Sequence, residues 1–138
     1  MAYQIRKVKY CYIIVPSRAG QAVRILDELK AAKIDLLAFS GFPLRDGKSQ
    51  VDLVTEQTGA IGRMAKSKGW KLSRVKRGFL VQGTDEIGAV HKVLGRLAEK
   101  NINVTAADAV AAGKGRYGMI LWVNPQKYNT AARVLNAH

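Results

Sequence analysis

The sequence predicts an α+β protein built from two successive βαββαβ repeats, residues 1–76 and 77–138. Three observations support this fold class. The chain matches itself at a fixed offset, each half contains a helical apolar periodicity, and polar glycine-containing turns separate short apolar runs. A length of 138 residues suits one compact domain or two very small ones.

The self-match occurs at an offset of 68 residues, without a gap, and pairs apolar residues with apolar residues and glycines with glycines. The matched pairs are Gly20–Gly88, Ile25–Val93, Leu26–Leu94, Leu29–Leu97, Ile34–Ile102, Leu36–Val104, Ala38–Ala106, Gly47–Gly115, Val51–Met119 and Leu53–Leu121. Because these matches stay in phase over such a long span, they indicate an internal duplication.

The first repeat contains six expected elements. They are a strand at 8–15, a helix from about Gly20, strands at 35–40 and 50–55, a helix at 58–67 and a strand at 70–75. Ala22, Ile25 and Leu29 follow the i, i+3, i+7 spacing of one apolar helix face. The Asp46-Gly47 pair between the second and third strands is typical of a hairpin turn.

The second repeat follows the same order. We expect a strand at 79–82, a helix with Val90, Val93, Leu94 and Leu97 on its apolar face, strands at 103–110 and 117–123, and a helix at 126–136. His138 matches Trp70, so the second repeat ends before its fourth strand. The β-α-β-β-α-β order is the ferredoxin-like arrangement, in which an antiparallel sheet carries both helices on one face. The open edge predicts a homodimer, or a strand from residues 1–7 that fills in.

Two passages carry a family resemblance. The second repeat contains Asp85-Glu86-Ile87-Gly88-Ala89-Val90, followed by Asn101-Ile102-Asn103-Val104. The first repeat contains Ser17-Arg18-Ala19-Gly20 and Lys33-Ile34-Asp35-Leu36. A polar residue, a glycine that opens a helix, and an Asn-Ile-like start of the second strand resemble the ACT domain. Both repeats lack the proline that often precedes the glycine in that family, and Asp35 replaces the family's asparagine in the first repeat.

The resemblance implies a non-catalytic regulatory or sensor protein whose effector, usually an amino acid, binds where two modules pack side by side. Carried over to this sequence, the implied ligand-binding residues are Asp85, Ile87, Gly88, Asn103, Ser17, Ala19, Gly20 and Asp35. Free N–H groups at a helix start suit a carboxylate, and an asparagine can both donate to and accept from a zwitterion. A purely structural role stays open, with Ser17 and Asp85 as N-caps and the glycines serving close helix–sheet packing.

The charge balance favours anionic partners. The formal net charge is +13, and the stretch 63–77 contains no acidic residue. Basic side chains with an aromatic among them can hold phosphates and stack a base, so a nucleic-acid-binding module is the alternative function. Its candidate residues are Arg63, Lys66, Lys68, Trp70, Lys71 and Arg74. An acidic protein partner or a merely solvated surface would explain the same residues.

Several other classes lack support in the sequence. The single cysteine, Cys11, excludes an internal disulfide and is expected to be buried in the first strand. The run Gly113–Gly118 fits G-x-G-x-x-G, but a strand rather than a helix follows it, so no dinucleotide or other cofactor is expected. No metal-ligand spacing or catalytic constellation is evident, and no apolar run approaches the ~18 residues of a membrane span. We therefore expect a cytoplasmic protein that is not an enzyme.

Overall fold

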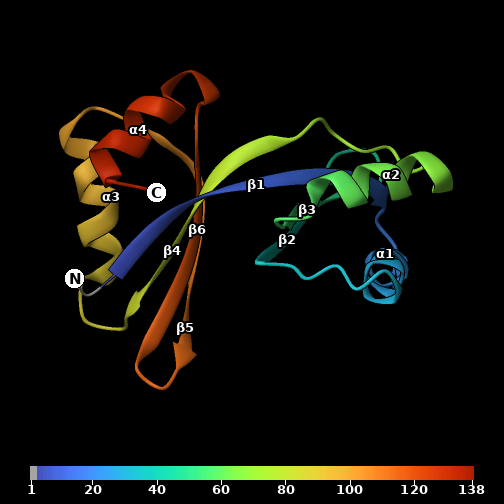
Figure 1. Ribbon diagram of the computed structural model, residues 1–138, viewed down its shortest axis with the longest axis horizontal. Helices are drawn as coiled ribbons and strands as arrows, with labels where there is room; N and C mark the ends of the chain where they lie inside the picture. The colour runs from blue at the N-terminus through green and yellow to red at the C-terminus, as the bar shows by residue number, and fades with distance from the viewer. Residues whose placement is uncertain (1–2) are drawn as a thin grey trace. The chain divides into compact units, whose positions relative to one another are not determined.

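The computed structural model describes residues 3–138, shown in Figure 1. Within these residues the order of elements is β1 (Tyr3–Pro16), α1 (Gln21–Ala31), β2 (Ala38–Pro43), β3 (Lys48–Val54), α2 (Thr58–Lys68), β4 (Lys76–Thr84), α3 (Ala89–Glu99), β5 (Val104–Gly113), β6 (Arg116–Val123), a 3₁₀ turn η1 (Pro125–Lys127) and α4 (Tyr128–Leu135). The fold is thus α+β. None of the helices in this span is long and apolar enough to cross a lipid bilayer.

The chain divides into two compact units. The first-repeat unit is Lys9–Lys76, and the second-repeat unit combines the chain up to Val8 with Arg77–His138. The division between β1 residues Val8 and Lys9 falls inside a strand, so β1 contributes to both units. The expected repeat boundary between residues 76 and 77 stays a prediction, because spatial grouping does not establish duplication.

In the first-repeat unit, β3 pairs antiparallel with β1 on one side and with β2 on the other. Side chains alternate between the two faces of a strand, so Cys11, Ile13 and Val15 of β1 share one face. They pack in one buried cluster with Ile25 and Leu29 of α1. The 3.6-residue periodicity therefore identified the buried face of α1 correctly.

The expected fourth strand at 70–75 is wrong. Only an isolated bridge joins Ile13 to Leu72. The Tyr12 N–H donates to the side-chain Oγ of Ser73 at 2.9 Å, and the Ser73 N–H donates to the Tyr12 carbonyl oxygen at 2.9 Å. Because the serine hydroxyl accepts the bond that a backbone carbonyl would accept in a ladder, this segment does not continue as a regular strand.

The second strand of the first repeat begins later than the expected residue 35, at Ala38. Backbone groups of Asp35 bond to side chains that precede α2. Its N–H donates to Gln57 Oε1 at 3.1 Å, and its carbonyl accepts from Thr55 Oγ1 at 2.7 Å. These bonds hold Asp35 in the loop before β2.

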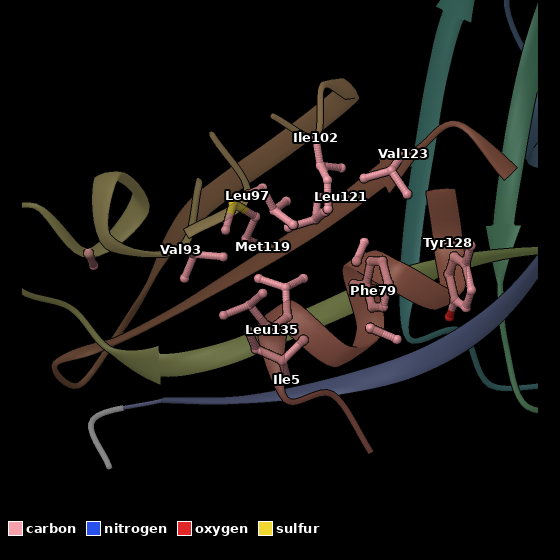
Figure 2. Close-up of a cluster of buried hydrophobic side chains, with 14 of the residues drawn as sticks. Ile5, Phe79, Val93, Leu97, Ile102, Met119, Leu121, Val123, Tyr128 and Leu135 are labelled. Carbon is pink, nitrogen blue, oxygen red and sulfur yellow. The ribbon is translucent and has the colours of Figure 1, made fainter. Parts of the chain in front are cut away.

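In the second-repeat unit, β6 pairs antiparallel with β4 and with β5. Figure 2 shows its core, in which Phe79 of β4, Val93 and Leu97 of α3, and Leu121 of β6 converge. The ring of Phe79 stacks on that of Tyr128, with centroids 4.5 Å apart and planes 7° from parallel. The expected second helix divides here into η1 and α4, because Asn124 Oδ1 accepts from the Gln126 N–H and opens the 3₁₀ turn.

The beginning of β1 belongs to this same core. Ile5 is 2% exposed and lies in the cluster of Figure 2. The His138 N–H donates to the Ile5 carbonyl oxygen at 3.1 Å, and the Lys7 N–H donates to the His138 carbonyl oxygen at 2.9 Å. This agrees with the expectation that residues 1–7 fill in beside the second repeat, although Met1 and Ala2 lie outside the described residues.

Candidate ligand-binding site

Helix α3 begins at a glycine in the left-handed conformation. Gly88 is the N-cap with φ 84°, and no side chain caps the helix. A Cβ built on Gly88 would meet no atom within 4 Å, so the glycine serves its positive φ and not close packing. Gly20 repeats this geometry at α1, with φ 87° and equally open surroundings. The interpretation of both glycines as packing residues is therefore wrong.

Ser17 and Asp85 are not N-caps, contrary to the structural interpretation of the sequence. Each lies three residues before the N-cap glycine. Their backbone N–H groups donate instead to Gly47 and Gly115 carbonyl oxygens, both at 2.8 Å. Because the left-handed glycine delays the helix start, the N–H groups of the first turn have no side-chain acceptor.

A pocket of about 260 Å³ lies at the start of α3. It is lined by Asp85, Glu86, Gly88, Ala89, Val90, His91, Ala109, Val110, Ala111 and Tyr117. The Ala89 N–H donates to the Glu86 carbonyl oxygen at 3.1 Å. The other N–H groups of the first turn and the helix dipole favour an anionic group at the helix start. The carboxylates of Asp85 and Glu86 favour a cationic group beside it. The pocket therefore offers complementary charge to a zwitterion.

Tyr117, which lines this pocket, carries an unpaired polar group. The residue is 5% exposed, and its hydroxyl is buried without a hydrogen-bond partner among the described residues. Burial raises the pKa of Tyr117, the charges of Tyr3 and Glu86 raise it further, and Lys92 opposes them. The hydroxyl is thus neutral at physiological pH and keeps both donor and acceptor capacity. About 90% or more of buried polar groups in proteins form a hydrogen bond, so the unpaired Tyr117 hydroxyl is exceptional.

An ion pair stands beside the pocket. Lys92 Nζ lies 3.0 Å from Glu86 Oε1, and the two side chains are 54% and 41% exposed. The hydrogen bond that Lys92 donates to the Glu86 carboxylate raises the pKa of Lys92, which therefore stays charged. Pairs as exposed as this one contribute little to stability, so a competing charge can replace either partner.

The structure brings together some of the expected ligand residues of the second repeat. Asp85 and Gly88 line the pocket, whereas Ile87 is fully exposed and is not among its lining residues. Asn103 is exposed and immediately precedes β5, which reaches the pocket through its other end, Ala109–Ala111. A helix of 11 residues spans about 16 Å, so its start and the following strand's start lie far apart.

The equivalent positions of the first repeat are arranged differently. Ser17 and Ser49 occupy the places of Asp85 and Tyr117, and Ser49 Oγ donates to Ser17 Oγ at 2.9 Å. Ala19 is exposed beside the N-cap Gly20. Asp35 lines a separate hollow of about 460 Å³ near the end of α1 and is not brought to Ser17. The first repeat thus satisfies its two hydroxyls internally.

Only two candidate residues of the alternative function, Trp70 and Lys71, line a groove of the first-repeat unit. This groove, of about 320 Å³, is lined by Ile13, Ile14, Val15, Pro16, Gln21, Arg24, Ile25, Gly69, Trp70 and Lys71. Lys68 is engaged with Glu28 at 2.8 Å. Arg63, Lys66 and Arg74 are not among the lining residues. Trp70 lines the groove and is partly buried against the unit's core.

The cysteine and the acidic residues form no other reactive centre that the structure describes. Cys11 is 0% exposed, as expected. Burial, and to a smaller extent the charge of Asp52, raises its pKa to about 11, which disfavours a thiolate. Among residues 3–138, no three His, Cys, Asp or Glu side chains gather as metal ligands.

Sequence reasoning missed Tyr117 and Glu86 as pocket residues. Tyr117 was recognised only as the first residue of a strand. Its unpaired hydroxyl depends on which groups the other strands and α3 bring near it, and no sequence pattern encodes that. Glu86 is adjacent to Asp85 in the Asp85–Val90 motif, so its position in the sequence was the available signal.

No protein-family model matches the sequence, and no curated protein matches it. Solved structures are similar to the chain in fold. Protein BT0572 from Bacteroides thetaiotaomicron has a TM-score of 0.78 and 15% identity, over 99% of this chain and 90% of that one. The ligand-free regulatory subunit of aspartate kinase from Thermus thermophilus has a TM-score of 0.64 and 13% identity, over 99% and 95%. The corresponding subunit from Thermus flavus has a TM-score of 0.62 and 16% identity, over 99% and 95%. At these identities the likeness shows the fold, which is ACT-like.

Proposed function

We propose that this protein is a non-catalytic regulatory or sensor protein that binds an amino acid in the pocket at the start of α3. One observation carries the proposal. A single pocket is lined by the start of α3, by the acidic residues Asp85 and Glu86, and by Tyr117, whose buried hydroxyl is unpaired among the described residues. The regulatory subunits of aspartate kinase that share the fold support a regulatory role.

The volume and the charged groups of the pocket suit an amino acid. The pocket has a volume of about 260 Å³. This volume lies below the range of about 300–1,000 Å³ that is typical of drug-sized ligands, which favours a small metabolite. The ligand carboxylate would lie at the N-terminus of α3, and its ammonium would lie at Asp85 and Glu86.

A second copy of the chain would complete the site. Strand β5 is at the sheet edge, and its residues after Val104 are exposed. Exposed edges favour pairing with another strand. Antiparallel pairing about a two-fold axis sets the start of one strand opposite the end of the other, which brings Asn103 of the partner subunit toward Ala109–Ala111. The proposal therefore includes a homodimer. Light scattering would measure the molar mass of the wild-type protein and of a variant with a charge in β5, such as Val110→Lys, which should disrupt the dimer.

The test is a thermal-shift screen against the twenty amino acids, followed by calorimetric titration of each one that binds. A ligand at 100 times its Kd should stabilise the protein by about 2.7 kcal/mol. Asp85→Asn should weaken binding at least about tenfold, since it removes a charge-assisted bond. Asp27→Asn is the matched control, because Asp27 is exposed on α1 of the first-repeat unit and does not line the pocket. If none of the twenty amino acids stabilised the protein, the proposal would be contradicted.

A second candidate function is nucleic-acid binding at the first-repeat groove. The observation that favours it is the meeting of Trp70, Lys71 and Arg24 in one groove, where an aromatic ring stands beside two cations. Binding of a single-stranded oligonucleotide should weaken steeply with salt. Lys71→Ala should reduce the salt slope by about 1, whereas Lys100→Ala, on the other unit, should leave it unchanged. A salt-independent affinity would reject this function.

A further inference from the structure

We infer that the ligand is an amino acid with a hydrogen-bonding side chain, and that the Tyr117 hydroxyl selects it against apolar amino acids of the same shape. This inference rests on the proposed function. It adds the chemical class of the side chain and the residue that determines specificity.

The energetic argument starts from the hydroxyl itself. Tyr117 is 5% exposed, its ring belongs to the apolar core, and its oxygen has no partner among the described residues. A ligand group that bonds to this oxygen satisfies a buried polar group, whereas an apolar side chain beside it leaves the group unpaired. Sites built to bond a ligand hydroxyl or amide reject analogues that lack it far more strongly than apolar pockets reject an extra methylene.

The geometry assigns the ligand's side chain to Tyr117. Tyr117 begins the wall of the pocket formed by β6, where it is in register with Ala111 of β5, and α3 forms another wall. The first turn of α3 and the Asp85 and Glu86 carboxylates engage the charged groups that every amino acid shares. The side chain is the remaining part that can reach the tyrosine, so Tyr117 discriminates among amino acids.

Access to the hydroxyl involves the ion pair beside it. The Tyr117 oxygen is covered, and the charges of Glu86 and Lys92 both act on the phenol. Their 3.0 Å ion pair is about half-exposed and therefore weak. A ligand ammonium can therefore replace Lys92 at Glu86, which lines the pocket.

The first repeat has no comparable unpaired group. Its counterpart of Tyr117 is Ser49, whose hydroxyl already donates to Ser17 at 2.9 Å. The demand for a polar ligand group is thus specific to the second-repeat unit. We expect one selective site per chain.

The experiment is calorimetric titration with two shape-matched pairs, threonine against valine and asparagine against leucine. In the wild-type protein, the polar member of at least one pair should bind at least about tenfold more tightly. Tyr117→Phe should reduce that preference to within about threefold, mainly by weakening the polar member. The variant removes only an unpaired oxygen, and circular dichroism would verify its fold.

Tyr128→Phe is the matched control. It deletes a buried tyrosine hydroxyl in the same unit, but this hydroxyl donates to the Gly78 carbonyl oxygen and does not line the pocket. The control should keep the wild-type preference. Equal binding of both pairs by the wild type, or an unchanged preference in Tyr117→Phe, would overturn the inference and leave the proposed function standing. Absence of binding by every amino acid would overturn both.

Discussion

The Tyr128 hydroxyl donates a 2.8 Å hydrogen bond to the carbonyl oxygen of Gly78, and both groups are buried. Tyr117, in the same unit, is nearly as buried but its hydroxyl has no partner among the described residues. Two tyrosine hydroxyls are thus buried in the same core, and only that of Tyr128 has a hydrogen-bond partner among the described residues.

The first prediction compares these two hydroxyls. Tyr128→Phe leaves the Gly78 carbonyl oxygen unsatisfied and should lower the free energy of unfolding by about 1–3 kcal/mol. Tyr117→Phe removes an unpaired polar atom from an apolar core and should leave that free energy unchanged or slightly raised. Urea denaturation of both variants measures the difference. Equal losses would show that the Tyr117 hydroxyl has a stabilising partner.

The second prediction concerns the glycine that opens α3. Gly88→Ala forces a side chain into φ 84° and should cost about 1–2 kcal/mol, although the new Cβ meets no atom within 4 Å. Gly95→Ala is the control within the same helix, where a Cβ also meets nothing within 4 Å. It should stabilise by about 0.5–1 kcal/mol through helix propensity. If chemical denaturation gives changes in unfolding free energy of opposite sign for the two variants, the backbone conformation at Gly88 causes the loss. Two losses of similar size would contradict this explanation.

The third prediction tests the beginning of β1 as part of the second-repeat core. Ile5→Ala removes a 2% exposed side chain from that cluster and should lower the free energy of unfolding by about 2–5 kcal/mol. Ile87→Ala deletes the same atoms from a fully exposed position and should change it by less than about 0.5 kcal/mol. Hydrogen exchange should report the loss in β4 and β6. Two variants of equal stability would refute this role of Ile5.

The fourth prediction uses the buried thiol of Cys11. Burial and Asp52 raise its pKa from 9.0 to about 11, so the folded state binds the thiol proton more tightly than the unfolded state does. The resulting stability is present below pH 9 and is lost as the pH rises toward 11. At pH 8, a thiol reagent should therefore label the native protein only as fast as it opens, and urea should restore rapid labelling. Immediate labelling of the native protein would contradict the burial.

Local sequence patterns predicted much of the secondary structure. The i, i+3, i+7 spacing placed Ile25 and Leu29 on the buried face of α1, and Asp46-Gly47 marked the turn between β2 and β3. Such patterns succeed because helix faces and hairpin turns depend on residues a few positions apart. The segment 70–75 failed for the complementary reason, since the Ser73 hydroxyl competes with the backbone for Tyr12.

The candidate site was only half predictable. The motif identified Asp85 and Gly88, which line the pocket, but it also selected Asn103, which the pocket does not include. A motif lists residues along the chain without placing them around a common ligand. The direction of α3 and β5 determines that Asn103 lies at the opposite end of the strand from Ala109–Ala111.

The sequence by itself determined the α+β class, the internal match at an offset of 68 residues, the glycine start of each first helix and the burial of Cys11. These features follow from local periodicity, backbone freedom and hydrophobicity. Only the tertiary structure decided that Ile5 joins the buried cluster of Phe79, that Ser49 bonds to Ser17, and that the Tyr117 hydroxyl has no described partner. Whether a buried group is packed or paired depends on residues distant in sequence, whose positions are set by the packing of the whole unit.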